Sequence, residues 1–451
     1  MKQIRKAHEN TLTILGAAKR PAAGCRLMKY CLEARTDDGI LLLNLLTREM
    51  VLLSEEEYAN LTQLPELRQR WFVVPEELDE KEFADMVRWV RQSLARKKRT
   101  ITQYTILSTM DCNARCFYCY EKGRPRTPMS AETADKTVDY IKAHCNEEKV
   151  NIMWFGGEPL YNLPVIDRIC EGLNREGVEY ACRMVSNGYL FDDETVEKAV
   201  SLWKLKHVQI TLDGTEAVYN RSKAFIYRQG SAYQVVLANI GRLLKAGIQV
   251  AIRLNLDLYN AENLMQLADE LAERFSGMGD LRVYTHLLFD DEHTEAKPRS
   301  DAQWTARYTA LQNLNDKLRA LGLASPRRLP GENRVNYCMA DSGSAVVVFP
   351  GGDLGLCEHL SEDGYVGHVD SQAWDKKIVA GWREPAEELP ECRDCFYYPS
   401  CLRLKQCPTI APCIPQFREQ CLRETQRSML QEYTLWRSGA QQEETEEQPD
   451  C

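Results

Sequence analysis

Residues 103–119 read QYTILSTMDCNARCFYC, an apolar strand-like run followed directly by Cys112, Cys116 and Cys119. Active-site groups of α/β folds gather at the carboxyl ends of the strands, so we expect these cysteines in a loop at that end. Three thiolates spaced by three and then two residues can bind three irons of a four-iron cubane and leave the fourth iron open to another ligand. A structural zinc site is the alternative, and it would need a fourth protein ligand nearby.

Strand-like runs recur along the chain after this motif, with helical stretches such as 130–145 and 232–247 between them. The further runs are residues 150–155, 180–186, 207–213, 248–257 and 281–289. Strands that alternate with helices in this way predict a parallel sheet covered by helices. We therefore expect an α/β fold in which residues 100–300 form a partial (β/α)6 barrel.

The composition restricts the class of protein. The 451 residues carry a formal charge of −9, which argues against a nucleic-acid-binding protein. No apolar run approaches the roughly 18 residues of a membrane span. The 17 cysteines of so long a chain fit poorly with the disulfide framework of small secreted domains, and the N-terminal segment has no convincing signal-peptide cleavage site. We expect a cytoplasmic protein with neither nucleic acid nor membrane as a partner.

The segments that flank the barrel have a different texture. Residues 1–95 contain short apolar runs and then helices, one of them starting at Ser54, and predict a small α+β domain. Residues 301–329 predict a linking helix. Residues 330–425 are rich in Gly, Pro and Cys, lack a helical or strand period, and are expected to need metal staples. Residues 426–451 predict a helix end and an acidic tail, GAQQEETEEQPDC, which we expect to be disordered.

Four motifs at successive strand ends resemble the radical SAM superfamily, whose members use S-adenosylmethionine (SAM). The cysteine triplet, with Tyr118 before its last member, resembles the cluster-binding signature of that superfamily. The other three motifs are Gly156-Gly157-Glu158-Pro159, Ser186-Asn187-Gly188 and Thr211-Leu212-Asp213-Gly214. The resemblance extends over about residues 101–290, and the four motifs together are far more specific than a cysteine triplet alone.

The resemblance implies a role for the first two motifs. The cysteine triplet would hold a [4Fe-4S] cluster whose open iron takes the amino and carboxylate groups of SAM. Tyr118 would lie against the adenine ring. Gly157 would allow close backbone approach, and Glu158 would accept a hydrogen bond from the SAM ammonium group. A plain Gly-Gly turn is the alternative for the second motif.

The later motifs would complete the SAM site. Ser186 and Asn187 would contact the ribose or the methionine part of SAM. Thr211 stands where relatives often carry a serine that faces the SAM carboxylate. Lys223 stands where they often carry arginine, which replaces a bidentate fork by a point charge, so Arg221 is a second candidate for that contact. A surface turn and a solvated helix are the alternatives for these residues.

The resemblance also implies the chemistry. The reduced cluster donates one electron to the sulfonium of SAM, and the 5′-deoxyadenosyl radical that results abstracts hydrogen from an unactivated carbon. The protein orients the target and excludes water. Arg253, Asn255 and Asp257 alternate to one face of the fifth strand, where they would bind substrate or form buried ion pairs.

A second set of cysteines resembles the SPASM extension, which carries auxiliary iron–sulfur clusters in peptide-modifying radical SAM enzymes. The elements Gly352-x4-Cys357 and Cys392-x2-Cys395-x5-Cys401 match, whereas Cys401-x5-Cys407 departs from the usual three-residue spacing. The resemblance implies two [4Fe-4S] clusters beside the SAM-binding one. We assign one cluster to Cys392, Cys395, Cys401 and Cys413, and the other to Cys338, Cys357 and Cys407.

The second of these clusters would keep an iron able to take a substrate thiolate. Cys421 lies in a helix-like stretch, so we favour it as a non-ligand, although with it eight cysteines would fill two cubanes. A zinc ribbon on Cys392 and Cys395 is the alternative.

The short strands and helices of residues 1–95 resemble the leader-peptide recognition elements of ribosomal-peptide maturases. Such elements bind a leader by adding it as a strand at a sheet edge. A structural subdomain without a binding role is the alternative.

Residues 40–58 and 209–225 look most like enzymes that form thioether crosslinks. The resemblance thus implies a cytoplasmic radical SAM oxidoreductase that joins cysteine sulfur to carbon in a ribosomally made precursor peptide. The expected partners are a precursor peptide with a leader segment and core cysteines, and an electron donor such as flavodoxin or ferredoxin. Formylglycine formation in a sulfatase, and carbon–carbon crosslinking or epimerisation of a peptide, share the machinery. A zinc-stapled peptide-binding scaffold without catalysis is the alternative from another class.

Overall fold

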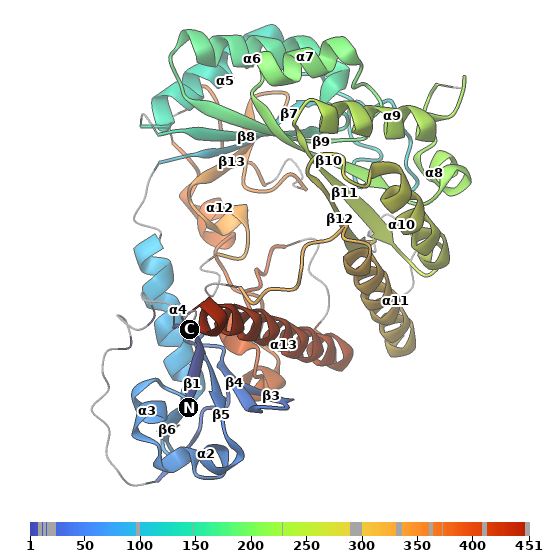
Figure 1. The fold of residues 1–451 in the computed structure, drawn as a ribbon. Coiled ribbons are helices and arrows are strands. Elements are labelled where there is room, and N and C mark those ends of the chain that lie inside the picture. Colours follow the sequence, from blue (N-terminus) through green and yellow to red (C-terminus); the bar gives the residue numbers. More distant parts are fainter. Residues whose placement is uncertain are drawn as a thin grey trace. The chain divides into compact units, whose positions relative to one another are not determined.

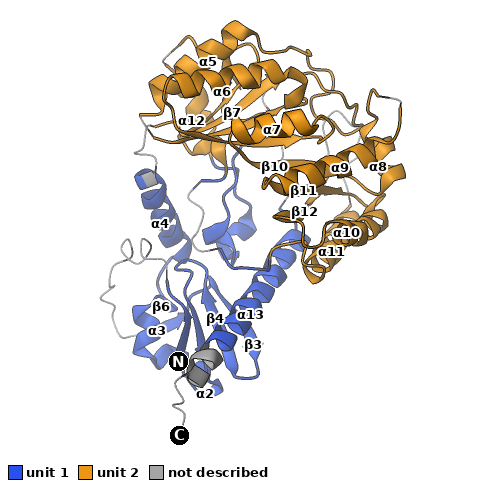
Figure 2. Cartoon of the chain, turned by 45° about the horizontal axis from the view of Figure 1, so that its top comes forward, with its two compact units in different colours: residues 1–97, 326–337, 385–451 blue, residues 98–325, 338–384 orange. Residues whose placement is uncertain are grey.

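The computed structural model describes residues 1–7, 11, 15, 24–95, 100–146, 148–227, 229–288, 300–330, 336–359, 364–371, 373–407 and 413–446. The chain divides into two compact units, shown in blue and orange in Figure 2. Unit 1 comprises residues 1–97, 326–337 and 385–451. Unit 2 comprises residues 98–325 and 338–384. The expected cysteine-rich segment 330–425 contributes to both units.

Unit 2 is built on a parallel sheet whose first six strands lie side by side in chain order. These strands are β7 (Gln103–Thr109), β8 (Val150–Gly156), β9 (Tyr180–Ser186), β10 (Leu205–Leu212), β11 (Gln249–Leu256) and β12 (Leu281–Leu287). The helices that follow them are α5 (Ala131–His144), α6 (Leu163–Arg175), α7 (Asp193–Ser201), α8 (Glu216–Lys223), α9 (Ala232–Lys245), α10 (Ala261–Phe275) and α11 (Asp301–Ala320). The predicted α/β fold with a partial barrel is confirmed (Figure 1).

Alternation along the strands decides which face of the sheet is available for chemistry. On β10, Val208, Ile210 and Leu212 are buried, whereas Gln209 and Thr211 on the opposite face are only partly buried. Successive side chains of a strand point to opposite faces, so the apolar set packs on one side and the polar set lines the other. The partly buried side chains of β10 therefore share one face of the sheet, and Thr211 lies on that face near the carboxyl end of the strand.

Three further strands extend the barrel sheet beyond β7. The strand β13 (Ala345–Val348) pairs in parallel with β7, and β14 (Asp353–Gly355) and β15 (Gly367–His368) continue antiparallel. All four residues of β13 are buried, as a continuous apolar run in a covered sheet would be. We expected residues 330–425 to be loop-rich and without strand period, and this is wrong for residues 345–348, because the pairing partner β7 is supplied from a distant part of the chain.

Unit 1 contains a four-stranded antiparallel sheet in the order β1-β5-β4-β3 and a two-stranded sheet of β2 and β6. The strands are β1 (Lys2–Arg5), β2 (Cys25–Leu27), β3 (Cys31–Thr36), β4 (Gly39–Asn44), β5 (Met50–Leu53) and β6 (Val73–Pro75). The helices are α2 (Glu55–Ala59), α3 (Pro65–Gln69), α4 (Glu80–Ala95) and α13 (Pro415–Glu446). The helix start at Ser54 is confirmed, because Ser54 and Glu57 form a capping box.

Short helical elements complete the two units. They are η1 (Leu61–Gln63), η2 (Pro159–Asn162), η3 (Met339–Asp341), α12 (Lys376–Gly381), η5 (Pro390–Asp394) and η6 (Tyr398–Ser400).

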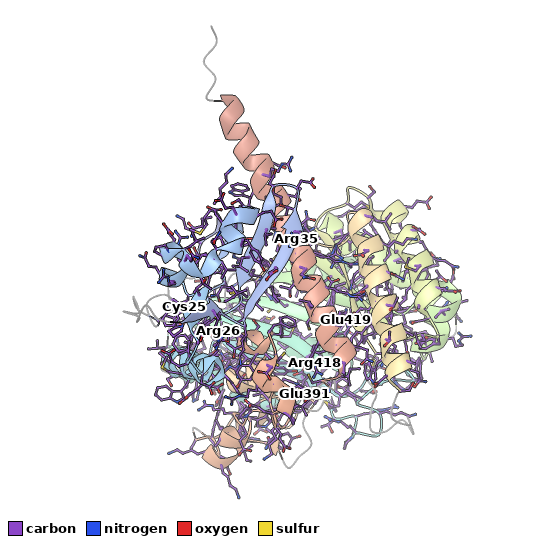
Figure 3. All side chains as sticks on the ribbon, turned by 90° about the horizontal axis from the view of Figure 1, so that it is seen from below. Cys25, Arg26, Arg35, Glu391, Arg418 and Glu419 are labelled. Atoms are coloured by element: carbon purple, nitrogen blue, oxygen red, sulfur yellow. The ribbon has the colours of Figure 1, made fainter. Side chains whose placement is uncertain are left out.

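The long helix α13 packs against the outer strand β3 of unit 1. Its Met429 and Tyr433 join the buried core with residues such as Leu32 and Leu43. The side-chain amide of Gln426 donates to the backbone carbonyl of Glu33, at 2.9 Å. Figure 3 shows Arg35 of β3 and Arg418 and Glu419 of α13. The edge of β3 is thus covered in part by the chain itself.

The acidic tail differs from its expected disorder. The helix α13 continues to Glu446, so residues 439–446 are helical, and residues 447–451 lie outside the described residues. Alanine, glutamine and glutamate dominate residues 440–446 and have high helix propensity, which lets an already formed helix propagate. Among the described helices, none is long and apolar enough to cross a membrane.

Candidate active site

The cysteine loop follows β7 directly, as predicted. Cys112, Cys116 and Cys119 are each partly buried, and the backbone N–H of Cys119 donates to the carbonyl of Cys116 at 3.2 Å. Burial raises the pKa of Cys112 to about 12 and that of Cys119 to about 11, and the neighbouring thiols contribute to both shifts. The three thiols are thus close enough for the charge of one to raise the pKa of another. They are protonated at neutral pH until a metal displaces the proton.

Nitrogen donors surround the first of these sulfurs. The backbone N–H of Ala114 lies 3.3 Å from Cys112 Sγ, and Asn187 Nδ2 lies 3.7 Å from it. Asn187 Nδ2 also donates to Asn113 Oδ1 at 2.5 Å. The sequence analysis did not single out Asn113, which lies between two cysteines and has no signal of its own. Donors directed at sulfur are one of the means by which proteins tune iron–sulfur clusters.

Gly157 brings the end of β8 against the start of the cysteine loop. Its backbone N–H donates to the carbonyl of Thr109 at 3.0 Å, and that of Glu158 donates to the carbonyl of Asp111 at 2.9 Å. A Cβ at position 157 would lie 2.2 Å from the Asp111 carbonyl oxygen, closer than real contacts allow. In this structure the close approach that requires glycine is to the loop backbone, and the predicted approach to SAM stays a prediction.

Replacing Gly157 by alanine will disturb the cysteine loop, because two backbone segments would have to separate. Overpacking of this kind costs about 1–3 kcal/mol in free energy of unfolding. Chemical denaturation followed by circular dichroism measures it. Gly241→Ala is the control. Gly241 is a helical residue, and a Cβ there would lie 4.0 Å from its nearest neighbour. Alanine at this position is expected to raise the free energy of unfolding by about 0.5–1 kcal/mol, because glycine is unfavourable inside a helix. Equal midpoints for the two variants would contradict the argument.

Glu158 is fully buried and ties the third strand end to the second. Its carboxylate accepts from Ser186 Oγ at 2.9 Å, from the backbone N–H of Asn187 at 2.8 Å and from that of Leu160 at 3.2 Å. Burial raises the pKa of Glu158 from its ordinary value of 4.5 to about 7, although these hydrogen bonds and Lys223 act in the other direction. The structure therefore brings together the predicted residues Glu158, Ser186 and Asn187, and through Asn187 joins them to Cys112.

The raised pKa of Glu158 predicts a pH-dependent stability. The folded protein holds a proton on this carboxyl that the unfolded chain releases above its ordinary pKa of 4.5. The stabilisation is complete below that pH and is lost as the pH rises through about 7. Melting temperatures of the SAM-free protein at pH 5 and pH 8 will therefore differ more for wild type than for Glu158→Gln. Glu179→Gln, at an exposed position, should keep the wild-type difference, and a Glu158→Gln variant that also keeps it would refute the prediction.

Tyr118, Asp213 and Lys223 form a buried triad beside the loop. The Tyr118 hydroxyl donates to Asp213 Oδ2 at 2.5 Å, Lys223 Nζ donates to the Tyr118 oxygen at 2.8 Å, and Lys223 Nζ lies 3.3 Å from Asp213 Oδ2. Although burial opposes the charge, Asp213 leads the interactions that raise the pKa of Lys223 above its usual range. Within the described residues, buried Asp213 Oδ1 has no hydrogen-bond partner. We assigned no role to Asp213 from sequence, although its motif was visible there.

The triad bears on two predicted SAM contacts. Lys223 directs its ammonium group at Asp213 and Tyr118, and Arg221 on the same helix is exposed. Tyr118 is partly buried, and burial raises the pKa of its hydroxyl well above the usual range. The adenine contact of Tyr118 and the carboxylate contact of Lys223 stay predictions.

Thr211 lies on the polar face of the sheet, in register with Arg253. Arg253 Nε donates to Asn255 Oδ1 at 2.9 Å, and Asp257 pairs with buried Arg307 at 3.4 Å. Of the two interpretations of these residues, substrate binding and a buried ion pair, the structure shows the ion pair for Asp257. The expected contact of Thr211 with SAM remains a prediction.

Five cysteines of unit 1 are close enough to affect one another's pKa. Burial raises the pKa of Cys421 to about 12, and Cys401, Cys395 and Cys413 contribute. Burial likewise raises the pKa of Cys395, with contributions from Cys413 and Cys392. Arg418 Nη1 lies 3.8 Å from Cys413 Sγ. Cys421, which we favoured as a non-ligand, thus lies near three members of the predicted ligand set.

The remaining predicted ligands belong to different units. Cys338 begins η3, where its Sγ accepts from the Ala340 N–H at 3.4 Å, and Cys357 Sγ accepts from the His359 N–H at 3.5 Å, both in unit 2. Cys407 Sγ lies 3.6 Å from the hydroxyl of Tyr337 in unit 1. The assignment of these three cysteines to one cluster stays a prediction.

The cysteine loop suits the expected cluster by its donor set. It offers three thiols that affect one another's pKa and nitrogen donors directed at one sulfur. It also lies beside a buried carboxylate oxygen of Asp213 that has no hydrogen-bond partner among the described residues. Across the described ranges, no group of three or more Cys, His, Asp or Glu side chains is placed so that it could hold a metal ion as it stands. The fit to a cluster therefore rests on the kinds of donor that the loop supplies, three thiols with nitrogen donors beside one of them.

Comparison with known families gives a match over the part of the chain that contains the cysteine loop and the strand ends. Residues 106–285 match the model of the Radical SAM superfamily, and the match spans β7 to β12. Residues 106–285 therefore form a radical SAM domain.

Curated relatives and solved structures resemble a larger part of the chain. An uncharacterized protein of Methanocaldococcus jannaschii is 25% identical over 270 residues, covering 58% of this chain and 87% of that protein. The AdoMet-dependent heme synthase of Methanosarcina barkeri is 23% identical over 321 residues, covering 65% and 88%. The structure of anSMEcpe with AdoMet and Cp18Cys peptide has a TM-score of 0.57 at 16% identity, covering 74% of this chain and 99% of that one. Streptococcus suis SuiB bound to precursor peptide SuiA has a TM-score of 0.52 at 14% identity, covering 84% and 94%.

Proposed function

We propose that this chain is a radical SAM peptide maturase that installs thioether crosslinks, from cysteine sulfur to carbon, in a ribosomally made precursor peptide. The observation that carries the proposal is the convergence of the three other strand-end motifs on the cysteine loop, through Glu158, Asn187 and Cys112 on one side and Asp213 and Tyr118 on the other. A [4Fe-4S] cluster on the three cysteines, with SAM bound, would supply a 5′-deoxyadenosyl radical.

The residues of the chain position and enclose that chemistry. Glu158 would offer its carboxylate to the SAM ammonium group, and its burial excludes water that would compete for the contact. Ser186 and Asn187 would contact the ribose or methionine part, Thr211 the carboxylate, and Gly157 would keep the loop close to the end of β8. Lys223 and Asp213 hold the Tyr118 hydroxyl, which fixes the ring proposed to face adenine.

The proposed auxiliary clusters involve the cysteine-rich segment. Cys392, Cys395 and Cys401 would bind one cluster with Cys413 or Cys421 as the fourth ligand, since both thiols interact with Cys395 and Cys401. Cys338, Cys357 and Cys407 remain the proposed ligands of the other. Three cubanes correspond to about 12 irons per chain.

Support for a peptide substrate comes from two resemblances in fold and from unit 1. The anSMEcpe and SuiB structures contain a Cp18Cys peptide and the precursor peptide SuiA, respectively. The antiparallel sheet of unit 1 has β1 and β3 at its edges, and a leader could add to it as a strand. Gln426 and α13 occupy part of the β3 edge, so a leader on that side would have to extend along the remaining part.

Anaerobic incubation with SAM, a reductant and the small cysteine-rich precursor encoded beside the gene tests the proposal by mass spectrometry. A thioether removes two hydrogens and blocks alkylation of one cysteine thiol. A loss of two hydrogens with all thiols still alkylated would indicate a carbon–carbon link. An unchanged mass with altered stereochemistry would indicate epimerisation, and formylglycine would carry its own mass change. Each of these would contradict thioether formation, and a colourless zinc protein free of sulfide would contradict catalysis altogether.

A further inference from the structure

We infer that the outward face of the cysteine loop is the docking surface of an acidic one-electron carrier protein. The inference rests on the proposed function, since it concerns how the cluster on that loop receives its electron. We call this surface the loop face and define it by Phe117, Leu258 and Tyr259 together with Arg115, Lys122 and Arg126.

The apolar part of the loop face stands out from the surface of unit 2. Phe117, between Cys116 and Tyr118, is 50% exposed, Tyr259 is 52% exposed and Leu258 is 42% exposed. The rings of Phe117 and Tyr259 meet edge to face, with centroids 5.9 Å apart, so the two residues form one continuous patch. Contiguous exposed apolar side chains with a polar rim are characteristic of an interaction site.

The cysteine loop and the segment that follows it carry exposed basic residues, in a chain whose net charge is −9. Arg115, Lys122 and Arg126 are all exposed. Arg115 and Arg126 face the same oxygen of Asp111, at 3.9 and 3.7 Å, which places them together on the loop. Lys122 follows Cys119 in a tight turn, since its N–H donates to the Cys119 carbonyl at 3.1 Å. Basic residues gathered in one segment of an acidic protein steer acidic partners to one place.

The position of the loop face favours an electron carrier over other partners. Two sides of the loop contact buried groups. Asn187 joins the loop to Glu158, and Tyr118 joins it to the Asp213–Lys223 pair. A carrier could therefore come close to the cysteines from the outward face. Electron tunnelling falls steeply with distance, and Phe117 is adjacent in sequence to a ligand. Electron-transfer complexes are small and transient, which the exposed Phe117–Tyr259 pair with basic residues on the same loop can support. In the transfer the carrier loses one electron and the cluster gains it, with no bond made or broken.

Charge reversal at these basic residues tests the inference. The variant Lys122→Glu with Arg126→Glu is compared with wild type and with Lys206→Glu, a control at the amino-terminal end of β10, away from the loop. Each reconstituted protein is mixed anaerobically with a reduced flavodoxin, and the reduced cluster is followed by stopped-flow absorbance and electron paramagnetic resonance. The same proteins are reduced by dithionite, which needs no docking surface.

We expect the charge-reversal variant to accept electrons from flavodoxin about tenfold more slowly at low ionic strength, with the difference shrinking as salt is added. Reduction by dithionite, and the SAM cleavage that follows, should match wild type, and Lys206→Glu should behave as wild type throughout. Equal rates from flavodoxin would overturn the inference, as would equal slowing with both reductants, which would place the defect in the cluster. Loss of precursor binding at an unchanged flavodoxin rate would also overturn it and assign the face to the peptide. A wild type that takes electrons and cleaves SAM but modifies no peptide would refute the proposed function alone.

Discussion

Cys112→Ala will lose SAM cleavage entirely, with 5′-deoxyadenosine formation falling to background. The thiol of Cys112 is the point where the strand-end network reaches the cysteine loop, since Asn187 and the Ala114 N–H both lie near its sulfur. Without it the loop has two thiols, whereas the proposed cluster needs three. The cluster is then not held, and its open iron is not available to SAM. Anaerobic incubation with SAM and dithionite, followed by chromatography of the nucleoside, measures the loss.

Iron content separates this cause from misfolding. If three cubanes are present, as we propose, the variant should retain the auxiliary iron and lose about four of the roughly 12 irons per chain. Cys25→Ala is the matched control, because Cys25 is a partly buried cysteine of β2, labelled in Figure 3, that belongs to no predicted ligand set. Undiminished nucleoside release by Cys112→Ala would show that the cluster is held elsewhere. Loss of activity in Cys25→Ala would show that any cysteine substitution damages the protein.

Lys223→Met will lower the free energy of unfolding by about 3–5 kcal/mol. The side chains of Lys223 and Asp213 are 5% and 0% exposed, and their charged atoms lie 3.3 Å apart. Methionine fills a similar volume but leaves the Asp213 carboxylate buried with Tyr118 as its remaining donor. An uncompensated charge in a buried site costs far more than the pair itself contributes, and denaturant unfolding measures the difference.

Two companions make the Lys223 prediction specific. Lys136→Met breaks an ion pair with Asp370 whose side chains are 38% and 51% exposed, and should cost at most about 1 kcal/mol. Lys223→Met combined with Asp213→Leu removes both charges and should recover most of the stability, because apolar replacements of buried pairs are often neutral. A single variant no less stable than Lys136→Met, or a double variant less stable than the single one, would contradict the account.

Much of unit 2 could be predicted from local sequence. The strand runs and the helices between them have periods of about 2 and 3.6 residues, which a few neighbouring side chains express without reference to the rest of the chain. The cysteine loop, Gly157 and the strand-end polar residues could be placed in the same way, since each directly follows a recognisable strand. The capping box at Ser54 is equally local.

The contacts of the site could not be predicted in that way. Asn113 has no periodic or spacing signal that distinguishes it from a surface residue, and the motif that contains Asp213 does not indicate that Asp213 pairs with Lys223 and Tyr118. The strand β13 belongs to a segment that looked irregular, and its extended form depends on pairing with β7. The proximity of Cys421 to Cys401 arises because α13 and the segment that holds η5 and η6 belong to the same compact unit.

The sequence by itself determined a parallel α/β barrel and a loop of three cysteines at the end of its first strand, because strand periodicity and cysteine spacing are properties of short stretches. Only the tertiary structure decided which groups meet there. Asn187 reaches Cys112 across 75 positions of sequence, and Lys223 reaches Tyr118 across 105. Such pairs are set by how strands and helices pack, since burial forces each polar group to find a partner among whatever the fold brings close.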